Sequence, residues 1–191
     1  AGNPIIGADV RVVDEFGEDV PRDGASIGEV VTRSHGVMHG YWKNPDATNE
    51  AIRNGYLHTG DMATIDENGY IDIVDRKKDI IISGGENISS IDAEGVLYER
   101  PASLDAAGIA APHEKWGETP HAFIVLREGF EDVSAADIIA FSRARLAHFK
   151  AVTSVTFLPE LPKTASGKIQ KVHLRNDYWE EQGKAGEKMV N

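Results

Sequence analysis

The sequence predicts an α+β protein in which a β-rich first part, residues 1–74, precedes a compact α+β second part, residues 75–191. Three observations carry this prediction. Apolar residues alternate in several short runs of the first part, and polar segments with Gly and Pro separate these runs, as in β-structure. The second part alternates between helix-like and strand-like segments. A dense charge cluster, DRKKD, begins at Asp75 and marks the boundary.

The elements of the first part follow from local patterns. Residues 5–13 and 28–33 alternate well enough to be strands, and residues 46–52, after an Asn-Pro pair, form a short helix. Residues 62–66 and 70–74 flank an Asn-Gly pair. Because Asn-Gly favours the tight turns of β-hairpins, these two segments are predicted to pair with each other.

The second part opens with a helix and two strands. Ser89 or Ser90 is suited to cap a helix that runs to about Arg100, because a side-chain hydroxyl accepts a hydrogen bond from a free amide of the first turn. Strands are expected at residues 104–111 and 121–126.

A second helix begins at Ser134 and has the clearest amphipathic pattern of the chain. Asp137 comes early and the basic residues come late, an order that complements the helix dipole. The apolar residues of this helix are Ile138, Ile139, Phe141, Leu146 and Phe149. A strand at residues 155–158, a helix at 172–182 and a polar tail from Gly183, expected to fray, complete the chain.

The composition argues against several classes of function. The net charge of −11, from 31 acidic residues against 20 Lys and Arg, argues against a nucleic-acid partner. No apolar run approaches the roughly 18 residues that cross a bilayer, and the first residues lack the layout of a signal peptide. The seven His residues show no metal-ligand spacing with carboxylates, so no metal site is predicted. The sequence contains no Cys, which fits a reducing compartment, and we expect the cytoplasm.

The first segment that carries chemistry is YLHTGD at residues 56–61. A carboxylate on a Gly-containing turn, such as Asp61, accepts two hydrogen bonds from hydroxyl groups and so suits the diol of a ribose. Taken alone, the segment is better interpreted as a turn whose Asp binds nearby backbone amides.

The second segment is the charge cluster and the glycine pair that follows it. Arg76 offers a rigid fork of donors that suits the same sugar as Asp61. An Ile run at residues 80–82 leads to Ser83, Gly84 and Gly85, where the absence of side chains lets the backbone approach a ligand. The alternative is a solvated charge run followed by a flexible turn.

The third segment is PKTASGKI at residues 162–169. Lys168, next to Gly in a loop of small residues, is a mobile positive charge that can reach phosphate and carboxylate oxygens. The segment is not a Walker phosphate loop, because Pro162 stands where the first Gly is required. An exposed surface lysine is the ordinary interpretation of such a residue.

Together, in this order, the three segments resemble the acyl-adenylate-forming superfamily, which includes acyl-CoA synthetases, adenylation domains of peptide synthetases and luciferases. GYWKNP at residues 40–45 and HEKWGE at residues 113–118 resemble further segments of the same family. The resemblance extends over nearly the whole chain. It implies that residues 1–74 are the barrel-like end of a large domain and that residues 75–191 are a mobile C-terminal domain.

The resemblance implies two half-reactions. A carboxylate attacks the α-phosphate of ATP, which arrives with Mg²⁺, to give acyl-AMP and pyrophosphate, and a thiol then displaces AMP. By position, Asp61 and Arg76 would hold the ribose. Lys168 would be the catalytic lysine that bridges the substrate carboxylate and the α-phosphate.

The same resemblance assigns the thiol step to the segment near the boundary. Asp75 would be the hinge about which the C-terminal domain reorients between the half-reactions. Ser83, Gly84 and Gly85 would line the path of the CoA pantetheine. The family's ATP-phosphate loop and acyl pocket would lie before Ala1, so we expect no adenylation by these 191 residues alone.

The leading expectation is the C-terminal part of an ATP-dependent acyl-CoA synthetase, because SGGENI at residues 83–88 is most similar to fatty- and aryl-acid CoA ligases. Two alternatives stay open. The chain could belong to the adenylating part of a peptide synthetase that loads a carrier protein. It could also be a non-catalytic truncated module that binds nucleotide or CoA.

Overall fold

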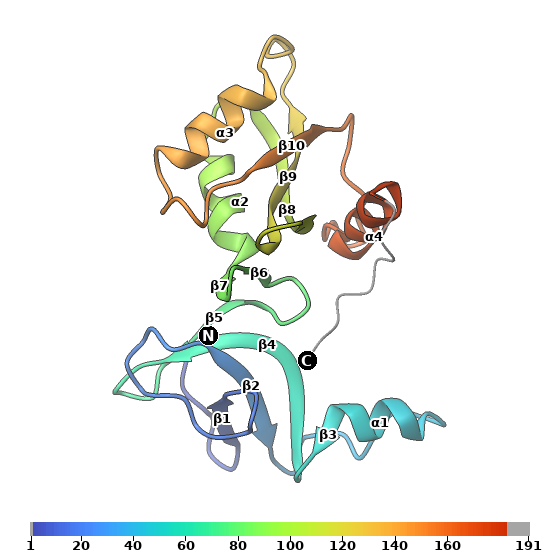
Figure 1. The fold of residues 1–191 in the computed structure, drawn as a ribbon. Coiled ribbons are helices and arrows are strands. Elements are labelled where there is room, and N and C mark those ends of the chain that lie inside the picture. The colour runs from blue at the N-terminus through green and yellow to red at the C-terminus, as the bar shows by residue number, and fades with distance from the viewer. Residues whose placement is uncertain (1, 183–191) are drawn as a thin grey trace. The chain divides into compact units, whose positions relative to one another are not determined.

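A computed structural model describes residues 2–182 of the chain. The polar tail that the sequence places from Gly183 lies outside these residues. The chain divides into two compact units, Ala1–Lys77 and Lys78–Asn191, and each is described by itself below. Figure 1 shows the elements of both units along the chain.

The first unit is built on one antiparallel five-stranded sheet with a short helix. The strands pair in the order β1-β2-β4-β3, and β5 also pairs with β4. The elements are β1 (Asp9–Val13), β2 (Gly28–Arg33), α1 (Pro45–Ala51), β3 (Ile52–Arg53), β4 (Tyr56–Ile65) and β5 (Ile71–Arg76). The alternation of the strand sequences places one set of apolar side chains in a common core: Val12, Val20, Val30, Ala63, Ile65 and Ile71.

The Asn-Gly hairpin is confirmed, and it joins β4 to β5. The Asp66 carboxylate accepts hydrogen bonds from the backbone amides of Asn68 and Tyr70, at 2.9 and 2.8 Å. Gly69 has a φ of +80°, a conformation that favours glycine. Ile71 pairs with Ile65 next to this turn, and a register shift between Met62 and Ala63 then places Arg76 opposite Asp61.

The expectation of a strand from residue 5 is wrong at its start, because β1 begins only at Asp9. Ile5 and Ile6 have side chains in solvent, with relative exposures of 79% and 104%. The Ala8 amide donates to the Ile5 carbonyl at 3.1 Å, which closes a turn around Gly7. Ile5 and Ile6 therefore belong to this turn and not to a strand.

The second unit has a sheet centred on one strand. β9 (Gly117–Leu126) pairs antiparallel with β8 (Ser103–His113), parallel with β10 (Ser154–Phe157) and, at Gly117, with β6 (Ile81–Ser83). β6 also pairs with β7 (Glu86–Ile88), a strand that the sequence did not predict. The helices are α2 (Ser90–Tyr98), α3 (Ala135–Arg143) and α4 (Lys171–Glu181).

The helices of this unit cover both faces of its sheet. Figure 1 shows α2 and α3 on one face of β8–β10 and α4 on the other. One core cluster joins α2 and α3 to the sheet through Leu97, Ile124 and Ile138. A second cluster joins Leu174 of α4 to Phe123 on the opposite face. Side chains of neighbouring strand residues point to opposite faces, so β9 contributes to both clusters.

The predicted helix caps are confirmed, and the predicted extent of α3 is not. The Ser89 hydroxyl accepts from the Ile91 amide, and Ser134 forms a reciprocal capping box with Asp137. α3 ends at Arg143, before Leu146 and Phe149, which were expected on it. The hydroxyl of Ser142, fully buried at the helix end, donates to the Ile139 carbonyl at 2.9 Å and so competes with the helical hydrogen-bond pattern.

None of the helices formed by residues 2–182 combines the length and the apolar character needed to span a membrane.

Candidate functional site

Asp61 and Arg76, both singled out from the sequence, lie opposite each other in the first unit. They are register partners on the antiparallel strands β4 and β5, and Arg76 Nε lies 2.8 Å from Asp61 Oδ1. Their side chains are 32% and 53% exposed, respectively. An acceptor and a multi-donor fork therefore stand together at a surface that a small polar molecule can reach.

The expectation that Asp61 lies on a turn is wrong, because Gly60 and Asp61 lie inside strand β4, and neighbouring residues hold this part of the strand. Gly60 has a φ of +72°, and its amide donates to Glu29 Oε1 at 3.2 Å, while its carbonyl accepts from the Lys77 amide at 2.8 Å. The Asp61 amide donates to the Thr59 hydroxyl oxygen at 3.1 Å. Backbone contacts of Gly60 and Asp61 thus fix this part of β4 and the position of Asp61.

Glu29 is a buried carboxylate that the sequence analysis did not single out. Its side chain is 9% exposed, and Oε2 lies 3.0 Å from His58 Nδ1 and 3.3 Å from Lys77 Nζ. Burial alone would raise the pKa of Glu29, but the hydrogen bond from His58 and the charge of Lys77 outweigh it and lower the pKa below its ordinary value. An ionised Glu29 therefore fits the cations around it.

Asp75, the predicted hinge, lies inside the paired part of β5. It pairs with Met62 of β4, is 3% exposed, and its Oδ1 accepts from the Arg76 amide at 2.7 Å. The compact first unit ends two residues later, at Lys77.

In the second unit, Ser83, Gly84 and Gly85 form the tight end of the β6–β7 hairpin. Ser83 pairs with Glu86, and the two glycines between them have φ values of +59° and +90°. Two successive positive φ values are typical of the short turns that close β-hairpins. This conformation requires glycine whether or not a ligand is present.

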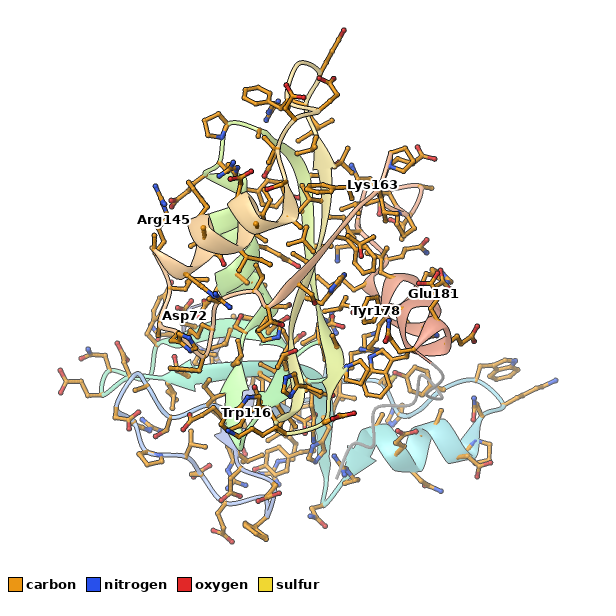
Figure 2. All side chains as sticks on the ribbon, turned by 45° about the horizontal axis from the view of Figure 1, so that its top comes forward. Asp72, Trp116, Arg145, Lys163, Tyr178 and Glu181 are labelled. Atoms are coloured by element: carbon orange, nitrogen blue, oxygen red, sulfur yellow. The ribbon has the colours of Figure 1, made fainter. Side chains whose placement is uncertain are left out.

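Trp116 packs against the first of these glycines. It lies in the turn between β8 and β9 (Figure 2), and its carbonyl accepts from the Gly84 amide at 2.9 Å. A Cβ on Gly84 would lie 2.9 Å from Trp116 Cε3, which is too close for an unstrained contact. Nothing lies within 4 Å of a Cβ on Gly85. The hairpin tip is therefore fixed at Gly84 by Trp116 and open at Gly85.

Lys168 lies on an exposed loop that is closed by its own hydrogen bonds. The Thr164 amide donates to the Lys168 carbonyl at 2.8 Å, and the Lys168 amide donates to the Thr164 hydroxyl oxygen at 3.1 Å. Gly167 turns the chain with a φ of +84°. The backbone that presents Lys168 is therefore ordered, while its side chain extends into solvent.

Lys168 differs from the lysines on either side of it. Lys163 Nζ lies 2.7 Å from Asp105 Oδ2, and Lys171 Nζ lies 2.7 Å from Glu94 Oε1. Figure 2 labels Lys163 on the segment before α4. Among the ion pairs and side-chain hydrogen bonds of residues 2–182, none involves the Lys168 ammonium group. Its charge is available to an anionic ligand.

The structure brings together some predicted residues and adds others. Asp61 meets Arg76 in the first unit, and Gly84 meets Trp116 in the second. Glu29 and Lys171 were missed, because their partners lie far along the chain and leave no local pattern in the sequence. Over residues 2–182, no group of three or more His, Asp or Glu side chains is arranged to hold a metal ion.

Comparisons with known proteins give the family context of these residues. Residues 92–168 match the AMP-binding enzyme C-terminal domain. The chain is 52% identical over 161 residues to a peroxisomal butyrate–CoA ligase of Arabidopsis thaliana, covering 83% of this chain and 28% of the relative. It is 45% identical over 187 residues to a peroxisomal benzoate–CoA ligase of the same plant, covering 92% of this chain and 32% of the relative.

Solved structures agree with the sequence relatives. The ATP-bound crystal structure of MatB from Rhodopseudomonas palustris matches with a TM-score of 0.83 and 34% identity, over 93% of this chain and 35% of MatB. The chain therefore spans about a third of the length of the proteins that it matches. The mixed α/β architecture of the second unit is that of the small C-terminal domain of these proteins.

Proposed function

Since the chain belongs to the AMP-binding, acyl-adenylate-forming enzyme family, we propose that it is the C-terminal part of an ATP-dependent acyl-CoA synthetase. One observation carries the proposal. Lys168 is presented on a hydrogen-bonded loop with an unpaired ammonium group, although the lysines at 163 and 171 are both ion-paired. An unpaired positive charge can bind anions, and adenylation brings two anionic groups, a carboxylate and a phosphate, together.

In the first half-reaction, a carboxylate oxygen of the acid attacks the α-phosphorus of ATP. The new phosphorus–oxygen bond forms as the bond to the bridging oxygen of pyrophosphate breaks, and acyl-AMP and pyrophosphate result. The two reacting groups are both anions and repel each other. The ammonium group of Lys168 would bridge them and offset the negative charge that builds on the α-phosphate oxygens.

Asp61 and Arg76 would hold the ribose of the nucleotide. Asp61 accepts from the two vicinal hydroxyl groups, and Arg76 keeps the carboxylate oriented through its 2.8 Å ion pair and offers further donors. Glu29 supports this arrangement through the Gly60 amide, so we assign it a positioning role.

In the second half-reaction, a thiol gives up its proton to water, its sulfur attacks the carbonyl carbon of acyl-AMP, and AMP leaves with the electrons of the broken carbon–oxygen bond. We propose that Ser83, Gly84 and Gly85 line the path of the pantetheine thiol, with the open side at Gly85. The proposed domain movement between the half-reactions starts at Asp75, close to the end of the first compact unit.

CoA is the proposed thiol, because the two relatives compared above are named as CoA ligases. Their acids, butyrate and benzoate, are an aliphatic and an aromatic acid, so a carboxylic acid is the substrate class proposed here. A carrier protein as the acceptor is the alternative within the same chemistry. Assays of thioester formation with CoA and with a phosphopantetheinylated carrier would separate the two.

The experiment that tests the function is ATP–pyrophosphate exchange by the full-length protein with a panel of carboxylic acids. Three proteins are compared: the full-length protein, its Lys168→Ala variant and the 191-residue chain alone. We expect exchange by the first and loss in the other two. Absence of exchange with every acid, together with retained CoA binding, would support the non-catalytic module instead.

The cytoplasm stays our proposed compartment, on the sequence evidence. The names of the two relatives include the peroxisome, so that organelle is the specific alternative. Fluorescence microscopy of the tagged full-length protein beside a peroxisomal marker distinguishes them.

A further inference from the structure

Lys171 joins three elements of the second unit at one point. It is the first residue of α4, and its ammonium group lies 2.7 Å from Glu94 Oε1 and donates to the Ser90 hydroxyl oxygen at 2.7 Å. The side chains of Lys171 and Glu94 are 16% and 14% exposed. Both Glu94 and Ser90 belong to α2, so this ion pair ties the start of α4 to α2 across the edge of the sheet.

Glu94 is itself fixed to that edge. Its Oε1 also accepts from the Gly108 amide of β8 at 2.8 Å. A Cβ on Gly108 would lie 3.3 Å from the Ser90 carbonyl oxygen, so glycine allows α2 and β8 to approach this closely. The carboxylate that receives Lys171 is therefore held by the strand as well as by its own helix.

The start of α4 has no side-chain cap of its own. The preceding residue, Gln170, makes no side-chain cap, and the first turn carries no acidic residue. A lysine at this end of a helix opposes the helix dipole. The first turn is therefore positioned by the contacts that Lys171 makes with α2, together with the packing of Leu174 in the core.

The same contact fixes the end of the loop that presents Lys168. The loop is closed by hydrogen bonds from Thr164 to Lys168 and from the Gln170 amide to the Pro162 carbonyl, at 2.8 Å each. A closed loop moves as one piece, and its last residue is bonded to Lys171. A shift of Lys171 would therefore displace Lys168, three residues earlier.

We propose that Lys171 and Glu94 are positioning residues that hold the Lys168 ammonium group in place for adenylation. The proposal rests on the function proposed above. Neither residue touches the reacting atoms in this account, because both are engaged inside the second unit. Misplacement of a catalytic group by about 1 Å is enough to lower a rate by up to about 100-fold, so losing the anchor has a measurable consequence.

The test separates the two half-reactions in the full-length protein. Lys171→Met and Glu94→Gln are expected to slow acid-dependent ATP–pyrophosphate exchange by about 10-fold or more. Thioester formation from synthetic acyl-AMP and CoA, in which Lys168 has no proposed role, is expected to stay within about 2-fold of the unsubstituted protein. A purely structural defect would lower both rates together.

A matched control comes from a second ion pair between a lysine and a carboxylate of α2. Lys150 Nζ also lies 2.7 Å from an α2 carboxylate, Asp92 Oδ2, but these side chains are 34% and 43% exposed. Exposed ion pairs contribute little, so Lys150→Met should leave pyrophosphate exchange within about 2-fold. Lys171→Arg, which keeps the charge, should recover most of the exchange.

The outcomes are distinguishable from failure of the proposed function. If Lys168→Ala retains exchange, the proposed function itself is wrong. If Lys168→Ala loses exchange while folded Lys171→Met and Glu94→Gln keep it within about 2-fold, only the positioning role is overturned. Equal losses in both half-reactions would also overturn it. Should Lys171→Met fail to fold, as judged by circular dichroism, Glu94→Gln and Lys171→Arg still decide the question.

Discussion

Arg76 and Asp61 face each other directly across β4 and β5, with 2.8 Å between the Arg76 Nε and Asp61 Oδ1 atoms. The hairpin turn at Asn68 and Gly69 joins the two strands, and the register shift between Met62 and Ala63 brings Arg76, rather than Asp75, opposite Asp61. Gly60, next to Asp61 in β4, has a φ of +72° and donates its amide to Glu29 Oε1. Both residues of the pair, Asp61 and Arg76, belong to the first unit, so the fold of that unit alone brings them together.

Asp61→Asn and Arg76→Met are expected to weaken nucleotide binding without harming the fold. Both side chains are partly exposed, so the free energy of unfolding should change by less than about 1 kcal/mol. The KM for ATP of the full-length protein should rise by about 10-fold or more, because an ionic acceptor or a multi-donor partner of the ribose is lost. Unchanged KM values for ATP in both variants would contradict the proposed contact of Asp61 and Arg76 with the ribose.

Glu29→Gln is expected to destabilise the first unit by about 1–3 kcal/mol, because Lys77 and His58 lose a buried anionic partner. Thermal unfolding followed by circular dichroism measures the loss. Since the folded pKa of Glu29 lies below its ordinary value of 4.5, its contribution is present above that value and disappears as the pH falls through the folded pKa. Glu15→Gln, at an exposed position, should have no such effect.

Gly84→Ala is expected to cost more than its positive φ alone explains. The added Cβ meets the Trp116 ring at 2.9 Å, and the clash should add about 1 kcal/mol to the backbone cost. In a Trp116→Ala background this added loss should disappear. A double-mutant cycle by urea unfolding, with Trp179 fluorescence as the probe, measures the coupling. A coupling energy near zero would mean that the Trp116 side chain moves away from the added Cβ without an energetic cost.

His121 makes the second unit sensitive to mild acid. Burial lowers the pKa of His121 to about 4 from its ordinary 6.5, and its ring packs between Phe123 and Tyr178, which projects from α4 toward the sheet (Figure 2). Between these two pH values, His121 binds a proton in the unfolded chain but not in the folded chain. The free energy of unfolding therefore falls as the pH falls from about 6.5 to about 4.

The expected loss attributable to His121 between about pH 7.5 and pH 5.5 is on the order of 1 kcal/mol. His121→Gln should remove this part of the pH dependence, whereas the exposed His148→Gln should keep it. Urea unfolding at the two pH values gives the comparison. Parallel pH profiles for the unsubstituted chain and His121→Gln would contradict the assignment.

The sequence predicted the features that depend on neighbouring residues. Asn68-Gly69 predicts its hairpin because the turn needs positive φ, and Ser134 predicts the start of α3 because its hydroxyl caps a free amide. The same logic fails where a distant contact decides. Leu146 keeps the helical spacing of α3 but packs against the core from beyond its end.

The candidate site divides in the same way. Asp61 and Arg76 are separated by one hairpin, so local turn chemistry brings their strands together, but the register shift between Met62 and Ala63 that pairs them leaves no sign in the sequence. Lys171 and Glu94 are 77 positions apart, and a lysine at the start of a helix gives no sign of a buried carboxylate on another helix. Trp116 contacts Gly84 through the pairing of β6 with β9, which the sequence pattern does not specify.

The role of Lys168 is tested by a rapid-quench measurement of both half-reactions in Lys168→Ala, made in the full-length protein with an acid that supports exchange. We predict that acyl-AMP formation from acid and ATP falls by about 100-fold or more, because the charge that bridges the two anions is gone. Thioester formation from synthetic acyl-AMP should stay within about 3-fold. Acyl-AMP formation at an unchanged rate would contradict the assignment of Lys168 and, with it, the proposed role of this chain.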